Sequence, residues 1–129
     1  MRFISSRAHG VLDYLVGILL ILAPRLLGFQ DTGAASQIPI FLGIATIVYS
    51  LLTRYELGLI RVLPFGVHLG IDLIAGIFLA ASPWLFGFAD RVWAPHLIVG
   101  LLEIFVSLAT RRDVVLPAQA HRGRGAAAH

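Results

Sequence analysis

Two histidine–aspartate pairs carry the most distinctive chemistry in this chain. His9 and Asp13 are four residues apart, and so are His68 and Asp72. On a helix this spacing places both side chains on one face, where they can hydrogen-bond each other or a neighbouring helix. Imidazole nitrogens and carboxylate oxygens are also suitable ligands for zinc or a non-haem metal. The pairs therefore allow either a hydrogen-bonded lock between helices or a metal site.

A third carboxylate, that of Glu103, is expected at the same depth in the membrane as the two pairs. Glu103 precedes Arg111 by eight residues, which is about 12 Å along a helix, and this brings it close to the level expected for Asp72. Hydroxyl residues recur at helical spacing on the same elements, as Thr46, Ser50 and Thr53 and as Ser107 and Thr110. The candidate intramembrane polar cluster is His9, Asp13, His68, Asp72, Glu103, Ser50 and Ser107, with His9, Asp13, His68 and Asp72 as candidate metal ligands.

The pairs belong to a pattern that occurs twice, at a constant offset of 59 residues. The pattern is His-x3-Asp-x3-Gly-x6-Pro-x3-Gly-Phe-x-Asp. The matching residues are His9, Asp13, Gly17, Pro24, Gly28, Phe29 and Asp31 in the first copy, and His68, Asp72, Gly76, Pro83, Gly87, Phe88 and Asp90 in the second. The pattern indicates an internal duplication.

The elements that carry these residues are apolar enough to cross a membrane. Hydrophobic residues make up 58% of the 129 residues and charged residues 13%, and the mean hydropathy is +0.88. A membrane helix needs about 20 mostly apolar residues, and four stretches qualify, at roughly 8–29, 37–53, 63–88 and 92–110. The first is too long and too polar for a cleaved signal peptide, so we expect it to be retained.

These stretches predict an all-α membrane protein of four transmembrane helices, arranged as two parallel two-helix hairpins with a pseudo-twofold axis along the membrane normal. The four-helix transmembrane domain covers 1–113, with repeats at about 5–56 and 61–112, and a flexible cytoplasmic tail follows at 114–129. Small and hydroxyl residues, such as Gly43 and Gly100, should lie at the helix contacts of a four-helix bundle.

Arginine accounts for all ten basic residues, and its distribution predicts the orientation. Eight of the ten lie before the first stretch, between the second and third, or after the fourth, and only Arg25 and Arg91 fall on the other side. Short Arg-rich loops stay in the cytoplasm. We therefore expect a multi-pass protein of the bacterial inner membrane with both termini cytoplasmic. The net charge of +3 then reflects topology, and no nucleic acid is expected as a partner.

The C-terminal part of each pattern copy predicts a bend in the helix and an anchor at the membrane interface. Proline bends a helix, and the glycine four residues later permits a left-handed turn. Trp84 fits an interfacial aromatic belt. The residues of this structural motif are Pro24, Gly28, Phe29, Ser82, Pro83, Trp84, Gly87 and Phe88. Residues 55–65, between the hairpins, predict a short interfacial connector rather than a catalytic loop.

Covalent catalysis has few candidates in this chain. There is no cysteine or lysine, no glycine-rich phosphate loop, no Gly-x-Ser-x-Gly and no His-Glu-x-x-His. We therefore predict no catalytic residues and lean against an enzyme. No cofactor is predicted outright. The alternatives are a metal or haem held by the His/Asp cluster, and an oligomeric proton or ion conductor that uses Asp72 and Glu103.

Ser82-Pro83-Trp84-Leu85-Phe86-Gly87-Phe88, with its echo in residues 23–29, resembles the SPW-repeat family of small bacterial integral membrane proteins. The resemblance covers about residues 5–112, although Ala23 and Arg25 replace Ser and Trp in the first copy. It implies repeats of two transmembrane helices and transfers no activity. The sequence thus favours a structural or accessory membrane component, with the lipid bilayer and either further copies of itself or other membrane subunits as partners.

Overall fold

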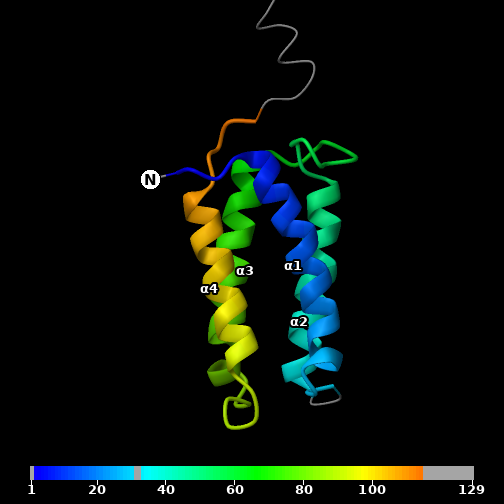
Figure 1. Cartoon of the computed structure of the whole chain (residues 1–129), viewed down its shortest axis with the longest axis vertical. Helices are drawn as coiled ribbons and strands as arrows, with labels where there is room; N and C mark the ends of the chain where they lie inside the picture. Colours follow the sequence, from blue (N-terminus) through cyan, green and yellow to red (C-terminus); the bar gives the residue numbers. More distant parts are fainter. Residues whose placement is uncertain (1, 31–32, 115–129) are drawn as a thin grey trace, which may run out of the picture.

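The computed structural model describes residues 2–30 and 33–114. The four helices in this part of the chain form two antiparallel hairpins that lie side by side in Figure 1. The helices are α1 (Ser6–Leu26), α2 (Ala34–Leu51), α3 (Phe65–Leu85) and α4 (Ala94–Ala109). The predicted all-α four-helix fold is confirmed. Asp31 and residues 115–129 of the predicted tail lie outside the described residues.

The helices have the length and composition of membrane spans. α1, α2 and α3 are each long and apolar enough to cross a bilayer, and α4 is a shorter apolar helix of 16 residues, about 24 Å long. Large hydrophobic side chains cover the outer surface; Phe41 is 71% exposed and Ile74 is 70% exposed. Such a surface needs lipid rather than water around it, as expected for a membrane protein.

In each hairpin, the two helices contact each other most closely at glycines. A Cβ atom on Gly43 would lie 2.5 Å from the carbonyl oxygen of Gly17, and one on Gly100 would lie 2.5 Å from the amide nitrogen of Ala80. Only glycine permits backbones to approach this closely. The predicted small-residue contacts therefore lie between α1 and α2 and between α3 and α4.

The two hairpins turn in the same way at the end that we call the turn end, at the bottom of Figure 1. Gly28 and Gly87 have φ angles of 78° and 72°, in the left-handed region that favours glycine. The amide of the following phenylalanine bonds back to the proline carbonyl, with Phe29 to Pro24 at 2.9 Å and Phe88 to Pro83 at 2.8 Å. The predicted left-handed turns are confirmed.

At the opposite end, the connector end, residues 52–64 join the hairpins. The extended N-terminal segment also pairs with the end of α4 there, since the Arg111 amide donates to the Ile4 carbonyl at 2.7 Å. The sequence placed Tyr55 in an interfacial connector, and Tyr55 does lie in the segment that joins the hairpins, but its side chain does not face outward. Tyr55 is fully buried against Phe65 and Leu69, because its hydroxyl reaches a buried carboxylate within the bundle.

Candidate functional site

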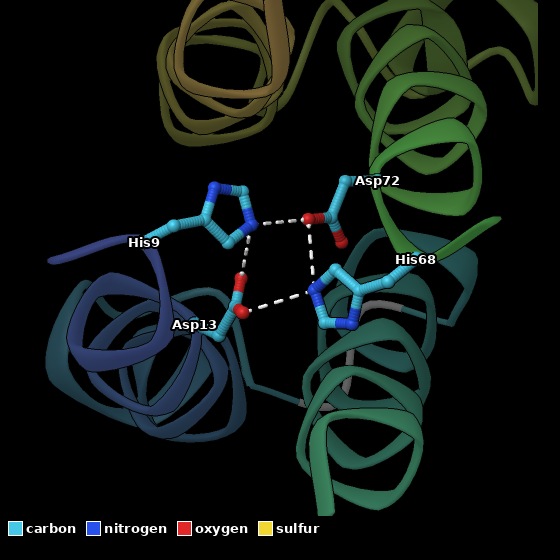
Figure 2. Close-up of side chains that lie close together, drawn as sticks. All are labelled: His9, Asp13, His68 and Asp72. Atoms are coloured by element: carbon cyan, nitrogen blue, oxygen red, sulfur yellow. Dashed lines mark hydrogen bonds and ion pairs between the residues drawn. The ribbon is translucent and has the colours of Figure 1, made fainter. Parts of the chain in front are cut away.

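Near the connector end, the four paired residues meet in one buried group, which we call the His/Asp ring (Figure 2). α1 supplies His9 and Asp13, and α3 supplies His68 and Asp72. His9 Nε2 lies 3.1 Å from Asp13 Oδ1 and 2.7 Å from Asp72 Oδ2. His68 Nε2 lies 2.9 Å from Asp13 Oδ2 and 3.2 Å from Asp72 Oδ2. Each imidazole thus faces both carboxylates, and the ring joins the two hairpins.

Helix geometry explains why these four side chains converge. Ser5 caps α1, accepting a hydrogen bond from the Ala8 amide at 3.1 Å, so His9 and Asp13 occupy the first two turns of that helix. His68 and Asp72 occupy the corresponding turns of α3, which begins at Phe65. Residues four apart share a helix face, and both faces point between the hairpins. All four residues are at most 7% exposed.

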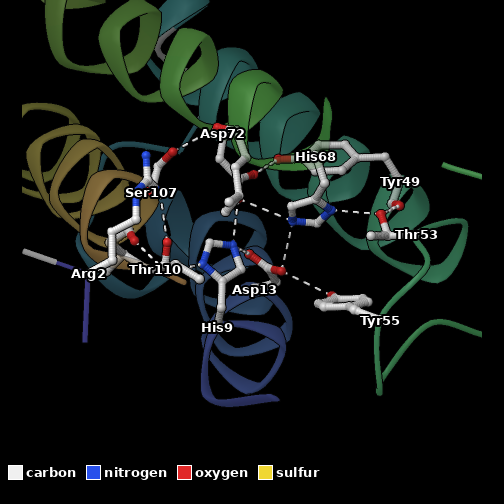
Figure 3. A network of polar contacts seen from close by, with 12 residues as sticks. Arg2, His9, Asp13, Tyr49, Thr53, Tyr55, His68, Asp72, Ser107 and Thr110 are labelled. Atoms are coloured by element: carbon white, nitrogen blue, oxygen red, sulfur yellow. Dashed lines mark hydrogen bonds and ion pairs between the residues drawn. The ribbon is translucent and has the colours of Figure 1, made fainter. Parts of the chain in front are cut away.

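Two threonines orient the imidazoles (Figure 3). His9 Nδ1 lies 2.8 Å from Thr110 Oγ1, and His68 Nδ1 lies 2.7 Å from Thr53 Oγ1. Each threonine hydroxyl already donates its single proton to a backbone carbonyl, Thr110 to Val106 and Thr53 to Tyr49. It can therefore only accept from the imidazole. Both histidines must carry a proton on Nδ1, which leaves Nε2 to face the carboxylates.

Two tyrosines hold the carboxylates. The Tyr55 hydroxyl donates to Asp13 Oδ2 at 3.0 Å, and the Tyr49 hydroxyl donates to Asp72 Oδ1. Tyr55 lies in the connector, where burial and the nearby Asp13 charge raise the pKa of its hydroxyl far above the usual range. The hydroxyl therefore keeps its proton and remains a hydrogen-bond donor. Both aspartates are held by a donor outside the ring.

The Nε2 atom of His68 is the least satisfied polar atom of the ring. It is buried and makes no well-aligned hydrogen bond to any residue that the structure describes, although carboxylate oxygens lie 2.9 and 3.2 Å away. At these distances a hydrogen bond fails only when the N–H direction points away from the oxygen. His68 Nε2 therefore lies between the two carboxylates, close to both but well aligned with neither.

The remaining members of the candidate cluster lie around the ring with different partners. Ser107 donates to the Leu69 carbonyl at 2.7 Å, whereas the buried Ser50 hydroxyl makes no hydrogen bond within the described residues. Glu103 lies on α4 and lines a small cavity of about 30 Å³ beside the ring. This cavity also touches His9, Asp13 and Asp72. Glu103 thus shares the ring's surroundings without joining it.

The structural motif lies at the turn end, away from the ring. Phe29 and Phe88 are buried and contact the His96 ring, with centroids 5.4 and 4.9 Å away. The Ser82 hydroxyl donates to the Leu79 carbonyl at 2.7 Å. Trp84 is 56% exposed, as an interfacial anchor would be. These contacts give the motif a packing role in the described structure.

The sequence interpretation missed the two tyrosines. Neither has a tyrosine counterpart in the second half of the chain, where Val106 and Arg112 stand at the matching positions. Repetition therefore could not reveal them. Only Tyr49 could have been found from the sequence, because it is next to Ser50 on a helix with a predicted stripe of hydroxyl residues. Tyr55 lies in the irregular connector, whose path has no periodicity.

Comparison with known proteins gives one match. A family model described as the SPW repeat domain matches residues 7–110. No curated protein and no solved structure matches the chain. The matched range contains the whole His/Asp ring and all four helices except the first residue of α1. The chain therefore belongs to the SPW repeat family.

Proposed function

We propose that this membrane protein binds one divalent transition-metal ion in the His/Asp ring. The observation that carries the proposal is the convergence of four buried ligand atoms, one from each ring residue, all within 4.8 Å of one another. In a tetrahedral zinc site, ligand atoms about 2.0–2.2 Å from the metal lie roughly 3.3–3.6 Å apart. The four neighbouring N···O distances are 2.7–3.2 Å, so a slight widening of the ring would accommodate the ion.

The proton positions support a cation at the centre. Because Nδ1 of each histidine donates to a threonine, a neutral imidazole would direct the Nε2 lone pair at carboxylate oxygens, which are also electron-rich. Such a ring is stable only if both Nε2 atoms are protonated or a metal ion lies between them. His68 Nε2 makes no well-aligned hydrogen bond although it lies 2.9 and 3.2 Å from two carboxylate oxygens, and a metal ion shared by the ring would satisfy it.

The donor set and the charge suit a divalent ion. Two imidazole nitrogens and two carboxylate oxygens are ligands for zinc and for iron, cobalt or nickel in the divalent state. The two carboxylates balance the charge of the ion, which matters in a membrane, where net charge is costly. The threonines and tyrosines around the ring resemble the outer hydrogen bonds that orient metal ligands in other proteins. A haem group would need far more space than the adjacent 30 Å³, so we propose an ion without a porphyrin.

The test is metal binding by the purified protein. The full chain is purified in mild detergent, stripped with a chelator and dialysed against Zn²⁺ or Co²⁺, and bound metal is measured by mass spectrometry. We expect one ion per chain in the wild type and none in the double variant His9→Gln, His68→Gln. His96→Gln is the matched control, since it removes a buried histidine outside the ring. A folded wild type that takes up neither ion would overturn the proposal.

We also propose that the protein assembles with itself or with other membrane subunits. Gly66 and Gly70 are exposed on α3, and a Cβ atom on either would meet nothing within 4 Å. Glycines one turn apart on a lipid-facing surface permit close helix association. Size-exclusion chromatography with light scattering in mild detergent is the test. We expect a defined oligomer or a co-purifying chain, and a clean monomer would contradict this.

The proposed location is the bacterial inner membrane with both termini cytoplasmic. The arginine distribution supports this orientation, since Arg2, Arg7, Arg54 and Arg61 all belong to the connector end of the bundle. Reporter fusions at the C-terminus and in the loop after Gly87 would test it. The C-terminal fusion should report a cytoplasmic position and the loop fusion an external one, and the reverse result would reject the orientation.

A further inference from the structure

The His/Asp ring is open on one side. The cavity of about 30 Å³ lies beside it and is lined by residues of α1, α2, α3 and α4. Three ring residues touch the cavity, but His68 does not. A site that only locks helices together gains nothing from such a space. Zinc sites with a purely structural role are usually closed, whereas reactive sites keep an accessible position.

Glu103 is the one carboxylate beside the ring that lacks a partner. Asp13 and Asp72 each accept a hydrogen bond from a tyrosine. In contrast, the Glu103 carboxyl makes no hydrogen bond or ion pair with any residue that the structure describes. A partly buried carboxyl without a partner is costly. The cavity beside it is the available place for one.

The size of the cavity restricts the partner to a very small molecule. A buried water needs about 10–15 Å³ by this measure of volume and two to four polar partners. The space therefore holds one or two waters, or a small anion of similar size. Thr46 also lines the cavity, and the rest of the lining is apolar, including Leu12, Val16 and Leu102. Larger substrates cannot enter without movement of the helices.

We infer that the cavity holds a small exchangeable ligand of the metal ion, either water that donates a hydrogen bond to Glu103 or a small inorganic anion that accepts one from the protonated Glu103 carboxyl. This inference rests on the proposed metal site. Glu103 is a positioning residue here and not a metal ligand. The arrangement makes the centre a reactive one, in which a fifth ligand can enter from the cavity while the four ring residues stay bound.

The test uses the full chain loaded with Co²⁺, whose visible spectrum reports its ligands, and azide as the probe. We expect azide to change the spectrum of the wild type with a saturable dependence on concentration. Val16→Phe should fill the cavity and weaken azide binding at least about tenfold, while one Co²⁺ per chain still binds. Val48→Phe is the matched control, since Val48 is 50% exposed on the outer surface of α2, and it should bind azide as the wild type does.

Glu103→Gln tests the second half of the inference. It should leave the Co²⁺ stoichiometry unchanged and alter the azide Kd at least about threefold, because the group that contacts the ligand has changed. Loss of Co²⁺ in this variant would make Glu103 a ligand and overturn its assigned role. A wild type that binds Co²⁺ but shows no azide response would overturn the inferred exchangeable ligand in the cavity and leave the metal site standing. A wild type that binds no Co²⁺ would instead overturn the metal site.

Discussion

His9 Nε2 and Asp72 Oδ2 lie 2.7 Å apart although they belong to different hairpins. The reciprocal contact, His68 Nε2 to Asp13 Oδ2, is 2.9 Å long. Between the hairpins, these contacts replace the glycine packing that closes each hairpin internally. The ring is therefore both the candidate site and the buried polar joint of the bundle.

Asp72→Asn should destabilise the folded protein strongly. The change removes a charge that both histidines face, and breaking a buried pair by removing one partner costs about 3–5 kcal/mol. Circular dichroism during heating in detergent should show a lower Tm. Asp90→Asn provides the control, since Asp90 is exposed in the loop between α3 and α4, and it should melt with the wild type. Equal Tm values for both variants would contradict a joining role for the ring.

Thr110→Val should weaken metal binding without removing a ligand. The substitution keeps the side-chain shape but leaves His9 Nδ1 without its acceptor, and outer hydrogen bonds of this kind contribute about 10–100-fold to metal affinity. Zn²⁺ affinity is measured by competition with a coloured chelator. Ser82→Ala removes a buried hydroxyl at the turn end and should leave the affinity unchanged. An unaltered affinity in Thr110→Val would show that this threonine does not contribute to metal binding.

The sequence predicted the elements and the shared face of each pair for a clear physical reason. Residues four apart on a helix lie on the same face. The apolar residues around His9 and Asp13 leave little alternative to a membrane span. The turns followed as well, because a glycine four residues after a proline has few other uses at a helix end. These features are local, so a single sequence contains them.

The contacts within the ring could not be predicted in the same way. Periodicity allows His9 to pair with Asp13 on its own helix, and the structure shows that it lies closer to Asp72 on α3. That choice depends on the rotation of two helices about their axes, which packing between the hairpins determines. The role of Tyr55 depends in addition on the path of an irregular connector. Such long-range geometry has no local signature.

Metal should stabilise the folded state in a saturable way. A ligand that binds only the folded protein adds about 2.7 kcal/mol at a free concentration 100 times its Kd. Zn²⁺ should therefore raise the Tm of the chelator-treated wild type. The double variant Asp13→Asn, Asp72→Asn should show no rise, because it lacks both carboxylate ligands. A similar rise in both proteins would point to nonspecific binding elsewhere and contradict the ring as the site.

Gly100→Ala should loosen the second hairpin, whereas Gly70→Ala should not. The added Cβ on Gly100 would lie 2.5 Å from the Ala80 amide nitrogen, a backbone atom that cannot move without shifting α3. Overpacking of this kind costs typically 1–3 kcal/mol. Within one chain, Gly70 on the outer surface of α3 has nothing within 4 Å of the added atom, so the same substitution there adds no clash inside the hairpin and affects only the proposed association surface. The two Tm values, measured in the same detergent, should differ with Gly100→Ala lower. If they agree, the close approach of α3 and α4 at Gly100 does not hold the hairpin together.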